Sequence, residues 1–362
     1  MAERRSSIEL LRILSMLAIV ATHFFWQTGD LAVHGGSFAV NWFCGFGTTA
    51  LNVFVLIGCW FMVDSRFRLE RPLRLYFETL GYTVPLTLVA LAAGAEPSMK
   101  DVLRGFLPFT GRALWFVSAY IVLMALTPWL SRAFALSRRS LALLVALTTG
   151  FVCGVSTLPD AQNTFLCHTV WLVVLYLFTG FFKRDIWPVW RRWTLVRAAV
   201  VALAGLAVYT AIIAARVYGP AFGGIGKVAS ALAVHFLEDF KTLPIFFVSL
   251  TVFQFFLRLD LGSVRWINRL AKSGFAVYVI HQTPAFYPFL WSGVFAVESW
   301  LHSAWYPLFA VGTVVSVYLA AVLIDSVRVV LAAALLPSAD RCAAAVRKLA
   351  QHLRRRLPKE VG

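Results

Sequence analysis

Charged residues are scarce in this sequence, and their scarcity argues against a soluble globular protein. Asp, Glu, Lys and Arg make up 14% of the 362 residues, whereas an ordinary soluble domain contains roughly 25%. Hydrophobic residues fill 60% of the chain, above the roughly 45–50% that is typical of soluble proteins. Acidic residues are the rarest charged type, at 17 against 33 Lys and Arg residues. The composition therefore predicts an integral membrane protein.

Patterns for disulfides, metal sites and secretion are also missing. The cysteines form neither a CxxC motif nor a Cys/His spacing, so we expect core residues rather than disulfides or metal ligands. No small-residue cleavage site follows the first apolar segment, so we do not expect a cleaved signal peptide. The formal charge of +16 comes from Lys and Arg clustered between apolar segments. This pattern favours a topology signal over nucleic-acid binding.

Long apolar segments dominate the rest of the chain. A membrane-spanning helix needs roughly 20 apolar residues, and we expect spans at about 8–28, 38–63, 75–94, 113–131, 140–157, 164–182, 195–215, 228–257, 273–295 and 305–336. The eighth is interrupted by HFLEDFKTLP (235–244) and could be a short surface helix followed by a span from near Pro244. The predicted fold class is an all-α polytopic membrane protein, a bundle of about ten transmembrane helices.

The basic residues predict the orientation of this bundle. Most of the 33 Lys and Arg residues fall on one side when both termini are placed in the cytoplasm, as the positive-inside rule requires. We therefore expect a multi-pass protein of the plasma or inner membrane, with a cytoplasmic N-terminus and C-terminus. A membrane domain at 1–340 would precede a basic cytoplasmic tail at 341–362. The tail suits either an amphipathic helix on the inner leaflet or a solvated segment.

The first span contains two basic side chains in an otherwise apolar helix, SIELLRILSMLAIVATHFF (7–25). The spacing from Arg12 to His23 is about 20° past three full turns and about 16 Å along the axis, so both lie on one face. Glu9 precedes Arg12 by one turn and can pair with it. Neither basic side chain is stable against lipid. We therefore predict that both line one continuous cavity, which opens to the cytoplasm near Arg12.

Two further arginines, Arg71 and Arg74, stand in the sequence RPLR at the predicted inner membrane face. Their spacing would let one helical turn direct both guanidinium groups at a phosphorylated ligand. An ordinary positive-inside loop would carry the same charges. We expect both arginines at the inner mouth of the cavity, and Asn52 of the second span in its wall.

Other polar residues within the spans have structural interpretations. We expect His281 to make a hydrogen bond between helices. Asp325 and Arg328 are one turn apart in the last span, so we expect a structural ion pair.

Five segments together resemble the acyltransferase family 3 membrane proteins, in order and spacing, over about residues 5–335. They are IELLRILSMLAIVATH with its Arg-x10-His pattern, NVFVLIGCWFM, RPLR, LWFVSAYIVL and YVIHQT. The chain departs from the family pattern at Gly58-Cys59, where Ser-Gly is common, which argues against a role for a serine there. Glu9 replaces the more usual aspartate and keeps its charge.

The resemblance implies a protein that takes an acyl group, usually acetyl, from cytoplasmic acyl-coenzyme A. The acceptor would be a hydroxyl, or sometimes an amine, of an envelope glycan or a lipid-linked sugar. His23 would be the catalytic histidine, and Arg12, Arg71 and Arg74 would bind the donor, with no metal. The chemistry agrees, because histidine titrates near neutral pH and arginine binds phosphate. Whether His23 acts as a base or carries the acyl group stays open.

Two other function classes fit parts of the sequence. A transporter of an envelope lipid or sugar would also need many spans, buried charges and a basic inner surface. A membrane anchor or sensor could recruit partners through the basic tail. The Arg12–His23 spacing and the RPLR segment favour the enzyme.

Overall fold

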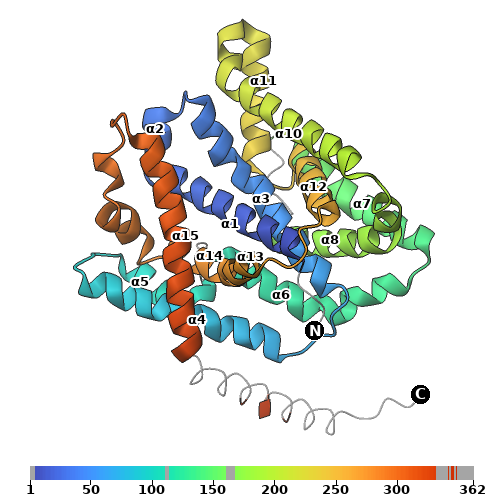
Figure 1. Cartoon of the computed structure of the whole chain (residues 1–362), viewed down its shortest axis with the longest axis horizontal. Coiled ribbons are helices and arrows are strands. Elements are labelled where there is room, and N and C mark those ends of the chain that lie inside the picture. The colour runs from blue at the N-terminus through green and yellow to red at the C-terminus, as the bar shows by residue number, and fades with distance from the viewer. Residues whose placement is uncertain are drawn as a thin grey trace.

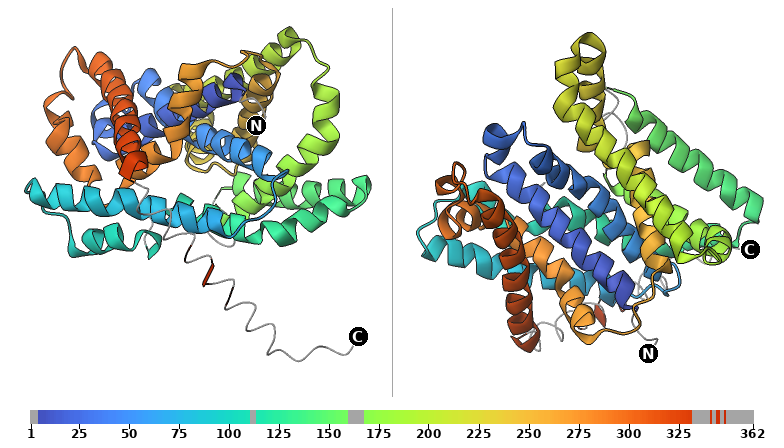
Figure 2. Two further views of the ribbon diagram at one scale, coloured as in Figure 1. Left: turned by 60° about the horizontal axis from the view of Figure 1, so that its bottom comes forward. Right: turned by 45° about the horizontal axis from the view of Figure 1, so that its top comes forward.

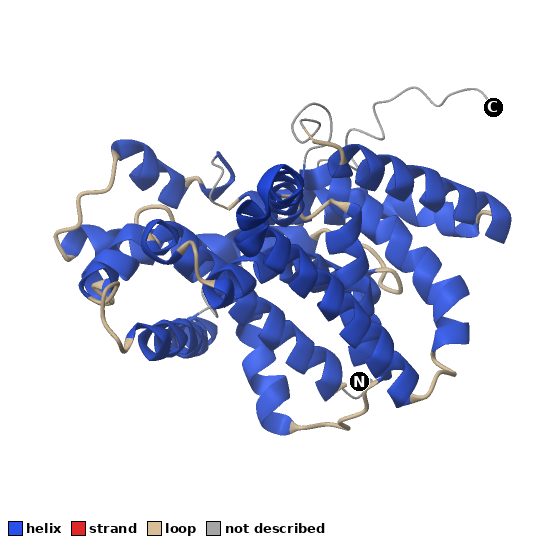
Figure 3. Ribbon diagram, turned by 90° about the horizontal axis from the view of Figure 1, so that it is seen from above, coloured by secondary structure: helices blue, strands red, loops and turns tan. Residues whose placement is uncertain are grey.

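The computed structural model describes residues 5–110, 114–159 and 168–331 and the isolated positions 341, 344, 345 and 348. In this part of the chain all regular structure is helical (Figures 1 and 3). The predicted tail at 341–362 otherwise lies outside the described residues. The α-helices are α1 (Ser6–Gln27), α2 (Asp30–His34), α3 (Phe38–Met62), α4 (Glu70–Ala92), α5 (Met99–Phe106), α6 (Trp115–Leu130), α7 (Arg138–Thr157), α8 (His168–Phe181), α9 (Trp187–Trp190), α10 (Leu195–Tyr218), α11 (Gly223–Glu238), α12 (Leu243–Arg258), α13 (Arg265–Leu270), α14 (Gly274–Gln282) and α15 (Tyr306–Leu331).

Short 3-10 and π-helical segments connect several of these helices. The 3-10 segments are η1 (Pro108–Thr110), η2 (Ser131–Ala135), η4 (Gly219–Phe222), η5 (Ala271–Ser273) and η7 (Val297–Ser299), and the π-helical segments are η3 (Phe182–Ile186) and η6 (Phe289–Val294).

Within the described chain, 7 helical stretches are long and apolar enough to cross a membrane. They are Ser6–Gln27, Phe38–Met62, Glu70–Ala92, Trp115–Ala135, Arg138–Thr157, Leu195–Glu238 and Tyr306–Leu331. The predicted all-helical fold with several membrane-length helices is confirmed. The eighth and ninth predicted spans instead correspond to broken helices. The sixth, 164–182, begins outside the described residues and continues as α8.

Two breaks interrupt the helices, and the first has a local cause in the sequence. Pro244 stands in the first turn of α12, where its missing N–H and fixed φ are favourable, so the chain from Asp239 to Thr242 is not helical. A second break follows Gln282, at the end of α14. Non-helical backbone inside a membrane bundle is stable only when protein buries it or a cavity adjoins it. Both breaks border the larger cavity described below.

Helices α1 and α3 form the centre of the bundle (Figure 1). In each, 61% of the membrane-length window is buried, against 28–33% in the other five. Their close approach depends on Gly47, because a Cβ atom there would overlap the side chain of Thr22. The Thr22 hydroxyl donates a hydrogen bond to the Cys44 carbonyl at 2.6 Å, which fixes one helix against the other.

Helices α10 and α11 extend beyond the central helices (Figure 2). A separate small apolar cluster ties them to α12 and consists of Tyr209, Ile213, Leu237, Ile245 and Val248. This packing positions the end of α11 against the large cavity.

Candidate active site

His23 lines a cavity of about 480 Å³ inside the helical bundle. Residues of α1, α3, α6, α8, α10, α11 and α14 form its wall, together with the α11–α12 connection, and it is not fully enclosed. Aromatic rings alternate with polar and charged groups along this wall, among them Trp26, Trp115, His168, Arg216 and Glu238. The predicted histidine therefore has space beside it for a substrate. We call this space the His23 cavity.

Arg12 lies on the same helix but not among the residues that line this cavity. Its guanidinium pairs with Glu9 at 2.8 Å, as predicted from their spacing. The aliphatic part of the side chain packs beside Gly274, at the start of α14. The ion pair satisfies a charge that would be costly in lipid.

His281 of α14 lies directly behind His23. Its Nε2 atom is 2.9 Å from His23 Nδ1, and its Nδ1 atom is 2.5 Å from the carbonyl oxygen of Val277. The predicted hydrogen bond between helices is confirmed, but its partner is the candidate catalytic histidine. His281 thus belongs to the candidate site, whereas its sequence context alone predicted a structural role. The sequence feature that could have indicated this role is the place of His281 in the YVIHQT segment.

Arg71 lines a second cavity, of about 290 Å³, at the junction of α3, α4 and α6. Arg71 Nη1 donates a hydrogen bond to Ser65 Oγ at 2.9 Å, and Arg68 lines the same space. Arg74 is exposed and is not among the lining residues. The prediction that both RPLR arginines frame one site is therefore corrected. Arg68, from the loop before α4, takes the second position in what we call the arginine cavity.

Four aromatic side chains lie where the two cavities approach each other. Phe54, Phe116 and Tyr278 line the His23 cavity, whereas Tyr120 lines the arginine cavity. The rings of Phe116 and Tyr120 stack at 5.6 Å between centroids. Phe116 also contacts Phe54 and Tyr278, at 6.0 Å and 5.5 Å. We call these four residues the aromatic layer.

The aromatic layer corrects the prediction of one continuous passage from Arg12 to His23. The two cavities share no lining residue and lie towards opposite ends of α3 and α6. Arg12 and Arg71 are both close enough to interact electrostatically with Tyr120. Helix spacing alone predicts an open path between Arg12 and His23, but large side chains of α3, α6 and α14 fill it.

Gly58 makes room for this arrangement. A Cβ atom at that position would lie 2.8 Å from the Tyr120 hydroxyl oxygen, closer than real Cβ contacts allow. The glycine lines the arginine cavity, while Cys59 beside it is fully buried. The departure from the family pattern at Gly58-Cys59 therefore has a packing reason in this chain.

Asn52 does not line the His23 cavity, contrary to the prediction. Its amide donates a hydrogen bond to the Phe240 carbonyl at 2.6 Å, and its side-chain oxygen accepts one from Trp171 Nε1 at 2.8 Å. Asn52 instead stabilises the non-helical connection between α11 and α12. The neighbouring residues Leu51 and Phe54 line the cavity wall.

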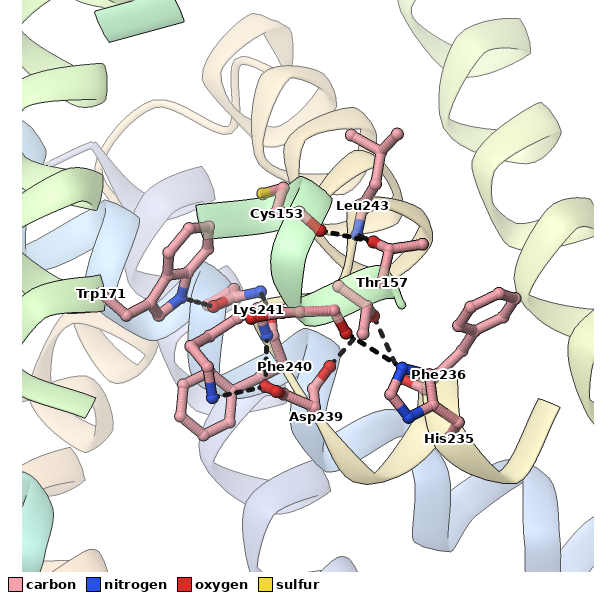
Figure 4. Close-up of polar contacts among 12 residues, drawn as sticks. Cys153, Thr157, Trp171, His235, Phe236, Asp239, Phe240, Lys241 and Leu243 are labelled. Carbon is pink, nitrogen blue, oxygen red and sulfur yellow. Dashed lines mark hydrogen bonds and ion pairs between the residues drawn. The ribbon is translucent and has the colours of Figure 1, made fainter. Parts of the chain in front are cut away.

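A buried ion pair also holds this break (Figure 4). Lys241 Nζ lies 2.8 Å from Asp239 Oδ1, and the two residues are 3% and 5% exposed. Between them, the Phe240 ring points to the His23 cavity and stacks in parallel on Trp115, with centroids 5.7 Å apart. The ion pair therefore supports part of the cavity wall.

The predicted Asp325–Arg328 pair is confirmed, at 2.8 Å. Asp325 also accepts hydrogen bonds from Tyr82 and Ser273, and Arg328 reaches Glu78 at 2.9 Å. This network connects α15 to α4 and to the start of α14, so its role is structural.

Across the described residues, no group of three His, Cys, Asp or Glu side chains could hold a metal ion. Guanidinium groups suited to an anionic ligand line both cavities: Arg68 and Arg71 line the arginine cavity, and Arg216 lines the His23 cavity.

Comparison with known proteins identifies the family of the chain. A family model for acyltransferase family 3, described as an acyltransferase domain, matches residues 5–325. No curated protein and no solved structure matches. The matched region begins just before α1 and ends within α15, so it includes both cavities and the contact between the two histidines. Because nearly the whole helical bundle lies within one acyltransferase domain, the chain belongs to acyltransferase family 3.

Proposed function

We propose that this membrane acyltransferase moves an acyl group from cytoplasmic acyl-coenzyme A to a hydroxyl of an envelope glycan or glycolipid, with acetyl-coenzyme A as the donor. The observation that best supports this proposal is the position of His23 beside a large cavity. The arginine cavity lies towards the other end of the same helices. The protein sits in the plasma or inner membrane with both termini in the cytoplasm. The arginine cavity then faces the donor pool.

The donor binds through its phosphate groups at the arginine cavity. Arg68 and Arg71 both line this space, and guanidinium groups bind phosphate through paired charge-assisted hydrogen bonds. Arg74 adds positive charge at the same end of α4. Arg12 is the next arginine along the path towards His23.

The flexible arm of the donor carries the thioester past the aromatic layer. About 16 Å separate Arg12 and His23 along α1, and a narrow, flexible chain fits between aromatic rings that turn aside. Phe116 and Tyr120 stand directly in this path, one turn apart on α6. Their rotation is the conformational step that transfer requires.

His23 then acts as the general base. It takes the proton of the acceptor hydroxyl while the hydroxyl oxygen attacks the thioester carbonyl carbon. The new C–O ester bond forms and the C–S bond breaks. The coenzyme A thiolate leaves and takes the proton from His23, which restores the starting state.

The acceptor enters through the His23 cavity, away from the arginine end. Trp26 and Trp115 offer flat aromatic surfaces to a sugar ring, and Gln27 and Gln282 offer amide groups to its hydroxyls. A cavity of about 480 Å³ has room for one sugar unit and the thioester end of the donor.

Two measurements test the proposed function. We expect purified protein in lipid nanodiscs, given labelled acetyl-coenzyme A and envelope extract, to release coenzyme A and label a glycan. We expect envelope glycans from cells with and without the protein to differ by an acyl mass in mass spectrometry. The absence of both results across several acyl chains would reject the transferase and favour the transporter alternative.

We expect Arg71→Ala to weaken donor binding more than Arg74→Ala does. Loss of a charge-assisted phosphate contact costs about 1.5–3 kcal/mol, which is roughly a 10- to 150-fold rise in Kd. Calorimetric titration with acetyl-coenzyme A measures this. Arg74→Ala is the matched control from the same helix, outside the cavity lining. Unchanged affinity in Arg71→Ala would leave RPLR as a topology signal alone.

A further inference from the structure

We propose that His281 is a positioning residue that fixes the protonation of His23, so that His23 presents an unprotonated Nε2 atom as the base. This inference rests on the proposed function of His23. It concerns a residue that does not line the His23 cavity and acts through the ring in front of it.

The partner of His281 Nδ1 determines where this ring carries its hydrogen. This nitrogen lies 2.5 Å from the carbonyl oxygen of Val277. A carbonyl oxygen can only accept a hydrogen bond, so His281 Nδ1 must carry the hydrogen. A lone pair at this position would face the oxygen lone pairs at close range.

The surroundings of His281 determine its charge. The residue is 0% exposed and lies inside a membrane bundle, where a cationic side chain is costly. Its side-chain hydrogen bonds are to the His23 ring and the Val277 carbonyl, neither of which carries a negative charge. His281 is therefore neutral, and a neutral imidazole has one N–H group.

The position of the hydrogen on His23 follows from that on His281. Because the hydrogen of His281 is on Nδ1, its Nε2 atom has a lone pair and accepts a hydrogen bond. The atom 2.9 Å away is His23 Nδ1, so that atom must donate. Neutral His23 then has its single hydrogen on Nδ1 and a free lone pair on Nε2.

The packing keeps this arrangement in place. The two rings meet at 42° with centroids 5.1 Å apart, so they are tilted rather than stacked. His281 is also in edge contact with Tyr278, at 6.1 Å. With His281 fixed between Val277 and Tyr278, His23 cannot rotate without losing its hydrogen bond.

The same contact stabilises the product of proton transfer. When His23 Nε2 takes the acceptor proton, the ring becomes an imidazolium, and its Nδ1–H bond to His281 becomes charge-assisted and stronger. The gain occurs as positive charge develops during the reaction. His281 should therefore affect kcat more than KM.

Three variants test this inference against a purely structural role. His281→Leu removes the acceptor and keeps much of the volume, and we expect roughly a 10- to 100-fold fall in kcat with an unchanged KM for acetyl-coenzyme A. His281→Gln restores an acceptor oxygen near the Nε2 position and should recover much of that loss. His235→Leu makes the same substitution at a partly buried histidine of α11 that does not line the His23 cavity, and it is the matched control. It should leave kcat nearly unchanged.

Nitrogen-15 NMR of histidine-labelled protein in nanodiscs provides a readout that needs no activity. We expect His23, assigned by comparison with His23→Gln, to carry its hydrogen on Nδ1 in the wild type. A hydrogen on Nε2, or a folded His281→Leu variant with wild-type kcat, would overturn the inference. A wild-type protein without transfer activity would instead reject the proposed function.

Discussion

Replacing His23 with alanine should reduce acyl transfer by about 10²- to 10⁴-fold, the usual contribution of a positioned general base. The side chain borders a cavity rather than filling the core, so the variant should still fold and insert. Coenzyme A release and glycan labelling in nanodiscs measure the loss. Thermal unfolding checks that the fold is retained.

His235→Ala is the matched control for this result. His235 is a partly buried histidine of α11 that contacts the Ser156 carbonyl and does not line the His23 cavity. Its replacement should leave transfer nearly unchanged. Substantial activity in a well-expressed His23→Ala protein would rule out the catalytic assignment, even though the family assignment would stand.

Replacing Asp239 with alanine should cause the largest loss of stability, about 3–5 kcal/mol of the free energy of unfolding. The change leaves the ammonium group of Lys241 without its carboxylate partner in a site that is 3% exposed. Thermal unfolding in detergent would show this as a lower Tm. Transfer should also fall, since Phe240 would lose its fixed place in the cavity wall.

Two controls separate the buried charge from general damage at this site. In Asp239→Ala combined with Lys241→Met, no charge remains, and much of the stability should return. Asp64→Ala removes the partner of Lys183 in an exposed pair, where Asp64 is 68% exposed, and should cost about 0–1 kcal/mol. Equal stability of Asp239→Ala and the wild type would contradict the prediction.

The features predicted correctly from the sequence depend on neighbours within one helix. Glu9–Arg12 and Asp325–Arg328 are both one turn apart, and both pairs form. Helical geometry alone determines such contacts. Most predicted spans likewise follow from local apolar composition, because the bilayer thickness sets how many apolar residues a spanning helix needs.

The features that were missed depend on packing between distant segments. His23 and His281 are far apart in the chain, and no periodicity in either helix indicates that their rings meet. Arg68 lies in a loop, where helical spacing does not apply, and it reaches the cavity that was assigned to Arg74. The aromatic layer combines residues of three helices, so it could not be predicted from any one of them.

The aromatic layer also has a consequence for the membrane itself. Two cavities that lie towards opposite ends of the same membrane helices would let ions leak through unless a barrier separated them. Among the described residues, the layer between the two cavities is about one helical turn thick, or roughly 5–6 Å. The aromatic rings have few polar atoms that could replace the water molecules around an ion, and removing that water costs free energy. Under the proposed function, these side chains keep the membrane closed to ions, including while the acyl chain of the donor passes.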